Sequence, residues 1–223
     1  MSEFYTTSLA DQVFEKLEDD IIHGKYVRGD ILTEMKLVEK LGVSRTPIRE
    51  ALRRLEQEHL IAETGKGSVV LGLTEEDALD IMQIRTYIEA LASFYATENI
   101  TEEGKEKLRH NLDLQEFYLS KRDAEHLRQM DDEFHDTISM LSRHLVIYYT
   151  LQPLHRKTRR FRRTAMEDRE RMQQVVQEHR EIFEAICAGD KDLAAQKTTE
   201  HVQHATSYAS NKYQEWKRGQ ENG

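Results

Sequence analysis

The sequence predicts a mainly α-helical protein of two domains: a small domain of three helices and a β-hairpin, followed by an all-helical antiparallel bundle. Two prolines and ten glycines in 223 residues, with many Glu, Lys, Arg, Leu and Gln residues, favour helices. Up to about residue 71 the expected elements are short and separated by glycines, whereas from Thr74 they are long and carry apolar residues at helical spacing. We therefore place one domain over residues 1–73 and a second over residues 74–223.

The first two helices of the small domain are marked by capping residues. Ser8 is a typical N-cap with Asp11 in the third helical position, and apolar residues then recur every four residues until Gly24. Thr33 caps a second helix, which ends at Gly42. These signals predict a long helix followed by a short one.

The third helix follows the second after a tight link. It starts at Ser44 or Thr46, with Pro47 in the first turn, where a missing N–H costs nothing. Its apolar residues are spaced i, i+3, i+4, i+7, and two apolar runs at residues 60–62 and 69–71 then predict the strands of a hairpin. Helix, short helix, tight turn, helix and hairpin is the order of elements in a winged helix-turn-helix.

The larger domain consists of long helical patterns separated by short breaks. We expect six helices, with the fourth interrupted at Pro153, over residues 74–98, 102–120, 123–142, 145–165, 170–188 and 190–213. Helices of this length with short connections pack as an antiparallel bundle.

Composition and charge exclude several classes of protein. No apolar run approaches the roughly 20 residues that span a bilayer, and no signal peptide is visible. Cys187 is the only cysteine, which excludes an internal disulfide and suits a reducing compartment. The net charge of −9 argues against a general coat for nucleic acid but allows a locally basic element. We expect a cytoplasmic protein that does not enter the membrane.

The third helix of the small domain carries arginines beside its apolar face. Arg45, Arg49 and Arg53 are four residues apart, so their guanidinium groups project from one side. An arginine can form two hydrogen bonds with guanine in the major groove of DNA. The hydroxyls of Ser44 and Thr46 stand at the helix N-terminus, which favours a phosphate. The alternative is a solvated face with arginines paired to acidic neighbours, but the tight turn before the helix and the Gly-Lys-Gly hairpin after it favour DNA binding.

Residues 41–55 carry a specific motif. They read LGVSRTPIREALRRL, which resembles the signature of the GntR family of bacterial transcriptional regulators almost residue for residue. The resemblance extends over nearly the whole chain and implies a regulator that binds an inverted repeat of double-stranded operator DNA as a homodimer. By matching positions, it implies DNA contacts from Ser44, Arg45, Thr46 and Arg49, with Gly65 and Lys66 at the tip of the wing.

Three positions depart from the pattern of that family. Met35 occupies a position that is often basic, so a phosphate contact there is missing or is taken over by Lys36. His59 replaces the glycine usual after the recognition helix and has to adopt the helix-end conformation itself, which histidine tolerates better than branched residues do. Glu63 makes the wing less basic, so the expectation of DNA contacts is stronger for the helix than for the wing.

The third helix of the large domain places two ionisable groups on an apolar face. Asp131 and His135 are four residues apart, and Leu127, Phe134 and Ile138 project on the same side. A buried unpaired carboxylate costs on the order of several kcal/mol, so some other group has to compensate its charge.

His179 and His201 repeat this anomaly on the apolar faces of two later helices. One histidine on an apolar face is more often a hydrogen-bonded core residue than a ligand. Three histidines and an aspartate that face inward from three helices instead favour a divalent cation, which cancels the carboxylate charge and uses the imidazole lone pairs.

The same residues carry a second resemblance. The run DDEFH at residues 131–135, the pair Glu178-His179 and, later, His201 are similar to the FCD ligand-binding domain of the FadR branch of the GntR family. This implies that a metal is held by Asp131, His135, His179 and His201. It also implies one or two open coordination positions for water or an effector carboxylate, and small organic acids or sugar acids as effectors. Zinc is our first expectation for the metal, with nickel, manganese and iron as alternatives.

Three arginines are candidates for binding the carboxylate of an effector. Arg85 lies beside apolar residues on the first helix of the bundle, where it could face an effector or pair with Glu89 at i+4. Arg159 and Arg163 belong to a basic run over residues 156–163, which could line an anion pocket, reach DNA or face solvent.

Together these patterns predict a DNA-binding transcriptional regulator whose operator affinity is controlled by a small carboxylate effector at a metal site. One alternative is a metal-dependent enzyme acting on a small organic acid, since a cation with an open position can activate water. Against it, no nucleophile–base pair stands out, and a DNA-reading helix is not expected in a catalyst, so we expect no enzyme. The other alternative is a DNA-binding protein with a purely structural metal.

Overall fold

The computed structural model describes residues 8–221, except for the side chains of 160–167, 216, 217 and 219–221. The chain separates into two compact units, which divide between Thr74 and Glu75. Within the described residues, no helix combines the length and the apolar character needed to cross a membrane.

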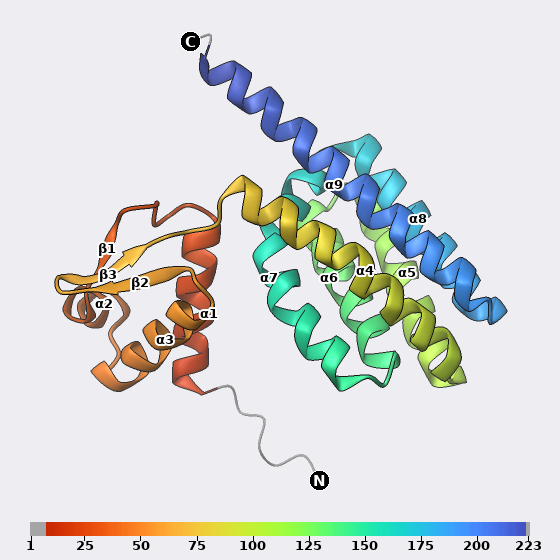
Figure 1. The fold of residues 1–223 in the computed structure, drawn as a ribbon. Helices are drawn as coiled ribbons and strands as arrows, with labels where there is room; N and C mark the ends of the chain where they lie inside the picture. Colours follow the sequence, from red (N-terminus) through yellow and green to blue (C-terminus); the bar gives the residue numbers. More distant parts are fainter. Residues whose placement is uncertain (1–7, 222–223) are drawn as a thin grey trace. The chain divides into compact units, whose positions relative to one another are not determined.

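The first unit, coloured red to orange in Figure 1, has the predicted winged helix-turn-helix architecture. Its elements are α1 (Leu9–Ile22), β1 (Ile31–Leu32), α2 (Glu34–Leu41), α3 (Arg45–Gln57), β2 (Ile61–Thr64) and β3 (Gly67–Val70). The predicted capping box is confirmed, because Ser8 and Asp11 each accept a hydrogen bond from the other's backbone N–H. The end of α2 at Gly42 is confirmed as well, with a left-handed φ of 67°.

The core of the first unit lies between α1, α3 and the sheet. Phe14 and Leu17 of α1 and Ile48 and Leu55 of α3 are at most 1% exposed. Burying a side chain of this size stabilises the fold by about 1.5–3 kcal/mol. Because one face of α3 is held in this core, its opposite face is presented to solvent.

The sheet of the first unit contains a strand that the sequence did not reveal. The strand order is β1-β3-β2, all antiparallel, with Ile61 opposite Val70 and Ile31 opposite Val69. The expectation of a two-stranded hairpin was therefore incomplete, because two residues are too few to show an alternating pattern. β1 also explains a glycine: a Cβ on Gly67, where φ is 128°, would lie 2.7 Å from the backbone oxygen of Leu32.

His59 adopts the left-handed conformation predicted for it, with φ of 58°. The N–H of His59 bonds to the carbonyl of Glu56, and the N–H of Leu60 bonds to that of Leu55. His59 thus ends α3 in the left-handed conformation that glycine usually adopts at a helix end, and the chain continues directly into β2.

The second unit is a bundle of long helices, coloured yellow to blue in Figure 1. They are α4 (Glu75–Asn99), α5 (Glu102–Lys121), α6 (Ala124–Leu141), α7 (Leu145–Glu167), α8 (Arg169–Ala188) and α9 (Lys191–Glu221). α4 packs along α9 and also contacts α6, α7 and α8, so it stands at the centre of the bundle. The predicted all-helical domain is confirmed.

The expected interruption at Pro153 was wrong, because α7 continues through it. A proline inside a helix removes one backbone hydrogen bond and usually bends or breaks the helix. Here Ile147 and Leu151 are buried before it, and His155 and Thr158 are buried after it. Packing on both sides therefore keeps the two halves of α7 helical.

Candidate DNA-binding and metal-binding sites

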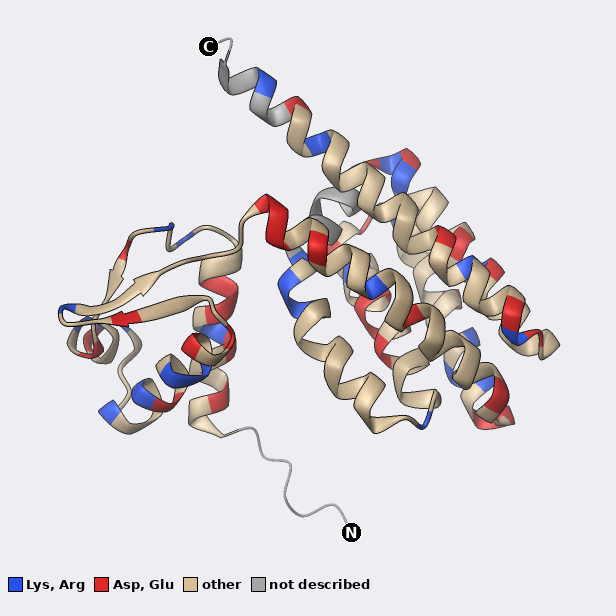
Figure 2. Ribbon diagram, viewed as in Figure 1, with Lys and Arg blue, Asp and Glu red and all other residues tan. Residues whose placement is uncertain are grey.

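The exposed face of α3 carries the residues expected to contact DNA. All the candidates on it are exposed, namely Ser44, Arg45, Thr46, Arg49 and Arg53. Figure 2 shows Lys and Arg as blue segments spaced along α3. Ser44 is the N-cap of α3, yet its hydroxyl forms no capping hydrogen bond. Gly65 and Lys66 are also exposed, in the two-residue loop between β2 and β3.

Arg49 is held by an acidic residue of the preceding helix. Its Nε donates a hydrogen bond of 2.7 Å to Oε1 of Glu34, at the start of α2. This hydrogen bond lowers the pKa of Glu34 and raises that of Arg49. The pair is exposed, and in it the guanidinium group of Arg49 is turned toward α2.

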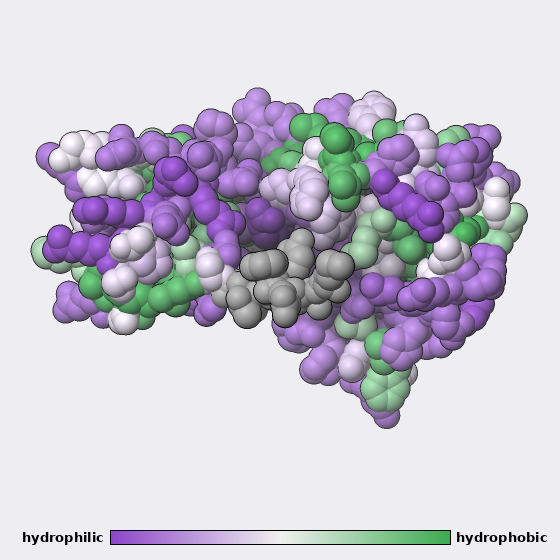
Figure 3. Space-filling model, turned by 90° about the horizontal axis from the view of Figure 1, so that it is seen from below, coloured by the Kyte–Doolittle hydropathy of each residue, from purple (hydrophilic) through white to green (hydrophobic). Residues whose placement is uncertain are grey.

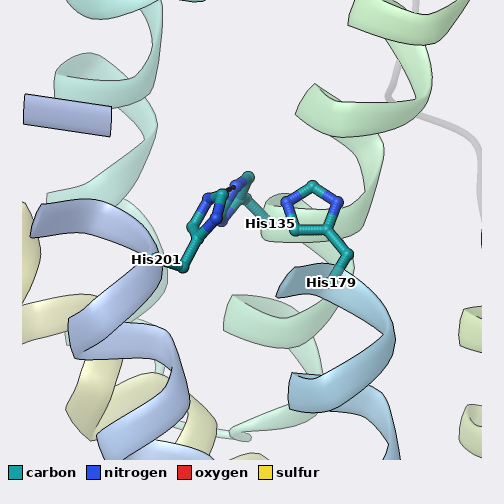
Figure 4. Close-up of side chains that lie close together, drawn as sticks. All are labelled: His135, His179 and His201. Atoms are coloured by element: carbon teal, nitrogen blue, oxygen red, sulfur yellow. Dashed lines mark hydrogen bonds between the residues drawn. The ribbon is translucent and has the colours of Figure 1, made fainter. Parts of the chain in front are cut away.

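Three histidines meet in the interior of the second unit. His135 of α6, His179 of α8 and His201 of α9 are each at most 4% exposed, and each offers a ring nitrogen within 4.8 Å of the other two. Figure 4 shows the rings of His135 and His201 next to each other, with His179 facing them. The sequence placed these residues on three inward faces, and the structure brings them together.

Two of the imidazoles have carboxylates behind them. Nδ1 of His135 lies 2.8 Å from Oε2 of Glu89, and Nδ1 of His201 lies 2.7 Å from Oε2 of Glu178. Ionised carboxylates only accept hydrogen bonds, so the Nδ1 atoms that face them carry a proton, and the Nε2 atoms of the two rings face each other.

The third imidazole is fixed by neutral amides. Nδ1 of His179 lies 2.9 Å from Oε1 of Gln115. Nε2 of Gln115 donates a hydrogen bond to Oδ1 of Asn111, and Nδ2 of Asn111 donates one to the carbonyl of Met130. This sequence of donors fixes the amide orientations, so His179 donates from Nδ1 and also directs a lone pair inward. The ring of Phe134 stacks on His179 with the centroids 4.2 Å apart.

The donor set fits a divalent cation. Nε2 of His201 is 3.3 Å from Nε2 of His135, and two imidazole lone pairs at this distance repel each other unless a proton or a cation lies between them. Oδ1 of Asp131, which is 3% exposed, lies 3.6 Å from Nε2 of His179 and 4.0 Å from Nε2 of His135. Three imidazoles and one carboxylate are ligands that zinc and similar ions accept.

The two carboxylates behind the histidines are held in the ionised form. Burial raises the pKa of Glu178, but hydrogen bonds from His201 and Arg171 outweigh it and lower the pKa to about 2. Burial also raises the pKa of Glu89, and the charges of Arg85 and His135 hold it well below its usual range.

A small cavity of about 10 Å³, with room for about one water molecule, adjoins the cluster at His135 and is lined by Glu89, Ala92, Ser93, His135, Ile138, Leu151, Ile182 and Thr198. Ser93 and Thr198 share a hydrogen bond of 2.6 Å between their hydroxyls. The cavity therefore combines apolar walls with a few polar groups, but it is far smaller than the sites that take small molecules.

The three arginines considered for an effector lie in different settings. Arg85 is 2% exposed, and it donates to Oε1 of Glu89 over 2.6 Å and to the hydroxyl of Thr158 over 2.9 Å. The i+4 pair, one of the two alternatives for this residue, is thus present. Arg159 is partly exposed, with Nε 3.7 Å from the carboxylate of Asp132. The side chain of Arg163 lies outside the described residues.

Three supporting residues of the histidine cluster, Asn111, Gln115 and His155, were not singled out from the sequence. Asn111 and Gln115 are i and i+4 on α5 and interrupt its apolar face beside Leu108 and Leu112, which are at most 1% exposed. That was a usable signal, of the same kind as the one that revealed Asp131. His155, 5% exposed between the carboxylates of Glu89 and Asp136, was missed because α7 was expected to break beside it.

Both the first and the second unit of the chain match known protein families. Residues 9–70 match the family of bacterial regulatory proteins called gntR, and residues 80–204 match the FCD domain. The chain belongs to the GntR family. The gluconate operon transcriptional repressor of Bacillus licheniformis is 31% identical over 178 residues, which cover 78% of this chain and 73% of that protein.

Other GntR-type regulators cover almost the whole chain. The galactonate operon transcriptional repressor of Escherichia coli (strain K12) is 27% identical over 225 residues, covering 90% of this chain and 96% of that protein. Among solved structures, E. coli McbR/YncC has the same fold, with a TM-score of 0.77 and 23% identity over 93% of this chain and 100% of that one. This GntR member is a DNA-binding transcriptional regulator rather than an enzyme.

Proposed function

We propose that this chain is a transcriptional repressor whose affinity for operator DNA is controlled by a small carboxylate or sugar-acid effector bound at a divalent cation. The observation that carries the proposal is the convergence of three buried imidazoles beside a buried carboxylate. The relatives named as repressors of gluconate and galactonate operons support the repressor role and the sugar-acid class.

The cation is held by Asp131, His135, His179 and His201, and zinc suits this donor set. When bound, it supplies a positive charge to which an effector carboxylate is attracted. The adjoining cavity has room for about one water molecule, so it has to widen to take the rest of the effector, with the hydroxyls of Ser93 and Thr198 as hydrogen-bond partners. Contacts from Arg85 require its pair with Glu89 to rearrange, whereas Arg159 and Arg163 remain candidate contacts at the edge of the site.

Operator DNA is bound by the exposed side of the first unit. Arg45, Arg49 and Arg53 enter the major groove, with Arg49 as a base contact. The N-terminus of α3, with Ser44 and Thr46, contacts a phosphate. The loop with Gly65 and Lys66 contacts the neighbouring backbone.

An inverted-repeat operator matches a homodimer with twofold symmetry. Figure 3 shows one face of the molecule as mainly hydrophilic with separate apolar patches. Six large apolar residues are exposed on α4 and α7, two helices that contact each other, namely Ile84, Tyr87, Leu91, Leu145, Val146 and Tyr149. A second copy of the chain would cover such a surface with the same residues.

The experiment measures operator affinity with defined metal and effector. A duplex selected from a random library by the protein is labelled, and fluorescence anisotropy follows its binding to chelator-stripped and zinc-reloaded protein. Gluconate and galactonate are the probes, and glucose, which lacks the carboxylate, is the matched control. We expect either acid to weaken binding by the zinc-loaded protein by about 5–150-fold, with no effect of glucose.

Two results would contradict the proposal. An equal response of the stripped and the zinc-loaded protein would remove the cation from the mechanism. A bundle that unfolds on chelation, together with operator affinity that no tested acid changes, would show that the metal is structural only.

A further inference from the structure

The two carboxylates behind the histidines, those of Glu89 and Glu178, have partners of the same kinds. Glu89 contacts Arg85, His135 and His155. Glu178 contacts Arg171, His201 and His204. Each carboxylate is therefore shared by one arginine, one histidine of the central cluster and one histidine outside it.

The contacts are short in both sets. Arg85 Nε is 2.6 Å from Glu89 Oε1, whose partner oxygen lies 2.8 Å from Nδ1 of His135. The two terminal nitrogens of Arg171 donate hydrogen bonds of 2.8 and 3.1 Å to the two carboxylate oxygens of Glu178. Nδ1 of His201 is 2.7 Å from the same carboxylate. Such paired contacts hold a carboxylate in one orientation.

We propose that Glu89 and Glu178 are positioning residues for the cation site, each fixing one histidine with Nδ1 protonated and Nε2 directed inward, while the arginine behind each balances its charge. This inference rests on the proposed metal function. Carboxylates behind metal-binding histidines hold the ring and raise its basicity. The charges of the Glu89–Arg85 and Glu178–Arg171 pairs cancel, so Asp131 carries the one negative charge that is left among these five residues. The site can therefore hold a dication without burying a large negative charge when the ion is absent.

The two positions differ in how readily they can be tested. The side chain of Glu89 is 4% exposed and lies among three helices, whereas that of Glu178 is 16% exposed and His204 beside it is 61% exposed. A change at Glu178 therefore disturbs packing less. Glu178→Gln keeps an oxygen that can accept from His201 but removes the charge and places an amide donor toward Arg171.

The test uses the full-length protein, stripped of metal and titrated with zinc in competition with a chromophoric chelator. We expect Glu178→Gln to bind zinc about 10–100-fold more weakly than wild type. Glu181→Gln is the matched control on the same helix, because that carboxylate contacts Lys197 and Gln177, and it should bind zinc as wild type does. A second readout is the ¹⁵N spectrum of the histidine rings, in which the Nδ1-protonated fraction of His201 should fall in Glu178→Gln.

The outcomes separate this inference from the proposed function. Wild-type protein that binds no zinc overturns both. Wild-type protein that binds zinc, with Glu178→Gln of equal affinity and unchanged ring spectrum, overturns the positioning role alone. If circular dichroism shows that Glu178→Gln is unfolded, Glu178→Asp replaces it: this variant keeps the charge but withdraws it by one methylene, and undiminished zinc affinity would contradict the proposal.

Discussion

Oε1 of Glu34 accepts the hydrogen bond that Nε of Arg49 donates, across the turn that joins α2 to α3. Since Nε is engaged by Glu34, a two-bond contact of Arg49 with guanine would use the two terminal nitrogens of the guanidinium group. In this contact the carboxylate of Glu34 orients the guanidinium group of Arg49. The same carboxylate places a negative charge near the DNA surface, which opposes DNA binding.

Glu34→Gln should therefore change specificity and general affinity in opposite directions. Removal of the negative charge strengthens binding to any duplex, whereas a less constrained Arg49 discriminates bases less well. We expect the ratio of operator to random-DNA affinity to fall by up to about tenfold, or 1.4 kcal/mol. Gel shifts with both duplexes at one salt concentration measure this ratio, and an unchanged ratio would show that Glu34 does not orient the arginine.

Arg49→Ala should weaken specific operator binding by about 1–3 kcal/mol, because a base contact is lost. Binding to random DNA should change less, since that depends on phosphate contacts. Lys105→Ala is the control for loss of one positive charge, at a residue of the second unit that pairs with Glu102. Equal losses on operator and random DNA would indicate a phosphate contact instead.

His179→Ala should reduce the metal content of the purified protein. The side chain is fully buried and supplies one of the three converging lone pairs. Elemental analysis against protein concentration measures the stoichiometry, and His126→Ala, at an exposed histidine of α6 paired with Asp123, controls for nonspecific binding. Full stoichiometry in His179→Ala would remove this residue from the ligand set.

His59→Gly should stabilise the first unit by about 1 kcal/mol, because a residue other than glycine is strained in the left-handed region. Glu58→Gly, one residue earlier at φ of −83°, should destabilise it, because glycine there only increases the freedom of the unfolded chain. Urea unfolding of both variants provides the comparison. Destabilisation by both would mean that the histidine side chain makes a contribution larger than the backbone strain.

Tyr208 predicts a dependence of stability on alkaline pH. Burial, and then the hydrogen bond of 3.2 Å that its hydroxyl donates to Asp168, raise the pKa of Tyr208 to about 12 from an ordinary value of 10.0. The unfolded chain loses this proton first, so the free energy of unfolding should fall as pH rises from about 10 to about 12. Urea unfolding of Tyr208→Phe should show a weaker decline over that range, whereas Tyr149→Phe, at an exposed tyrosine, should decline as wild type does.

Local signals in the sequence were sufficient for most of the fold. The capping box of Ser8 and Asp11, the glycine stop at Gly42 and the strained His59 each act within a few residues, so the sequence reveals them directly. β1 and the continuity of α7 could not be predicted in this way. Both depend on packing against segments distant in the sequence, the first against β3 and the second against the bundle core.

The candidate metal ligands were predictable for a related reason. Helical periodicity places Asp131 and His135 on an apolar face without knowledge of what packs there. Their supporting partners come from other helices: Glu89 is 46 residues from His135 in the sequence, and Gln115 is 64 residues from His179. Periodicity within one helix carries no information on such pairings, so the pairing of Glu89 with His135 and that of Gln115 with His179 emerged only from the structure.

α4 begins at Glu75, immediately after the division between the units, and reaches Glu89 without interruption. At 1.5 Å per residue, these fourteen steps span about 21 Å. The carboxylate next to His135 and the boundary between the units therefore lie on one continuous helix, so a rotation of α4 at Glu89 would also turn its first residue.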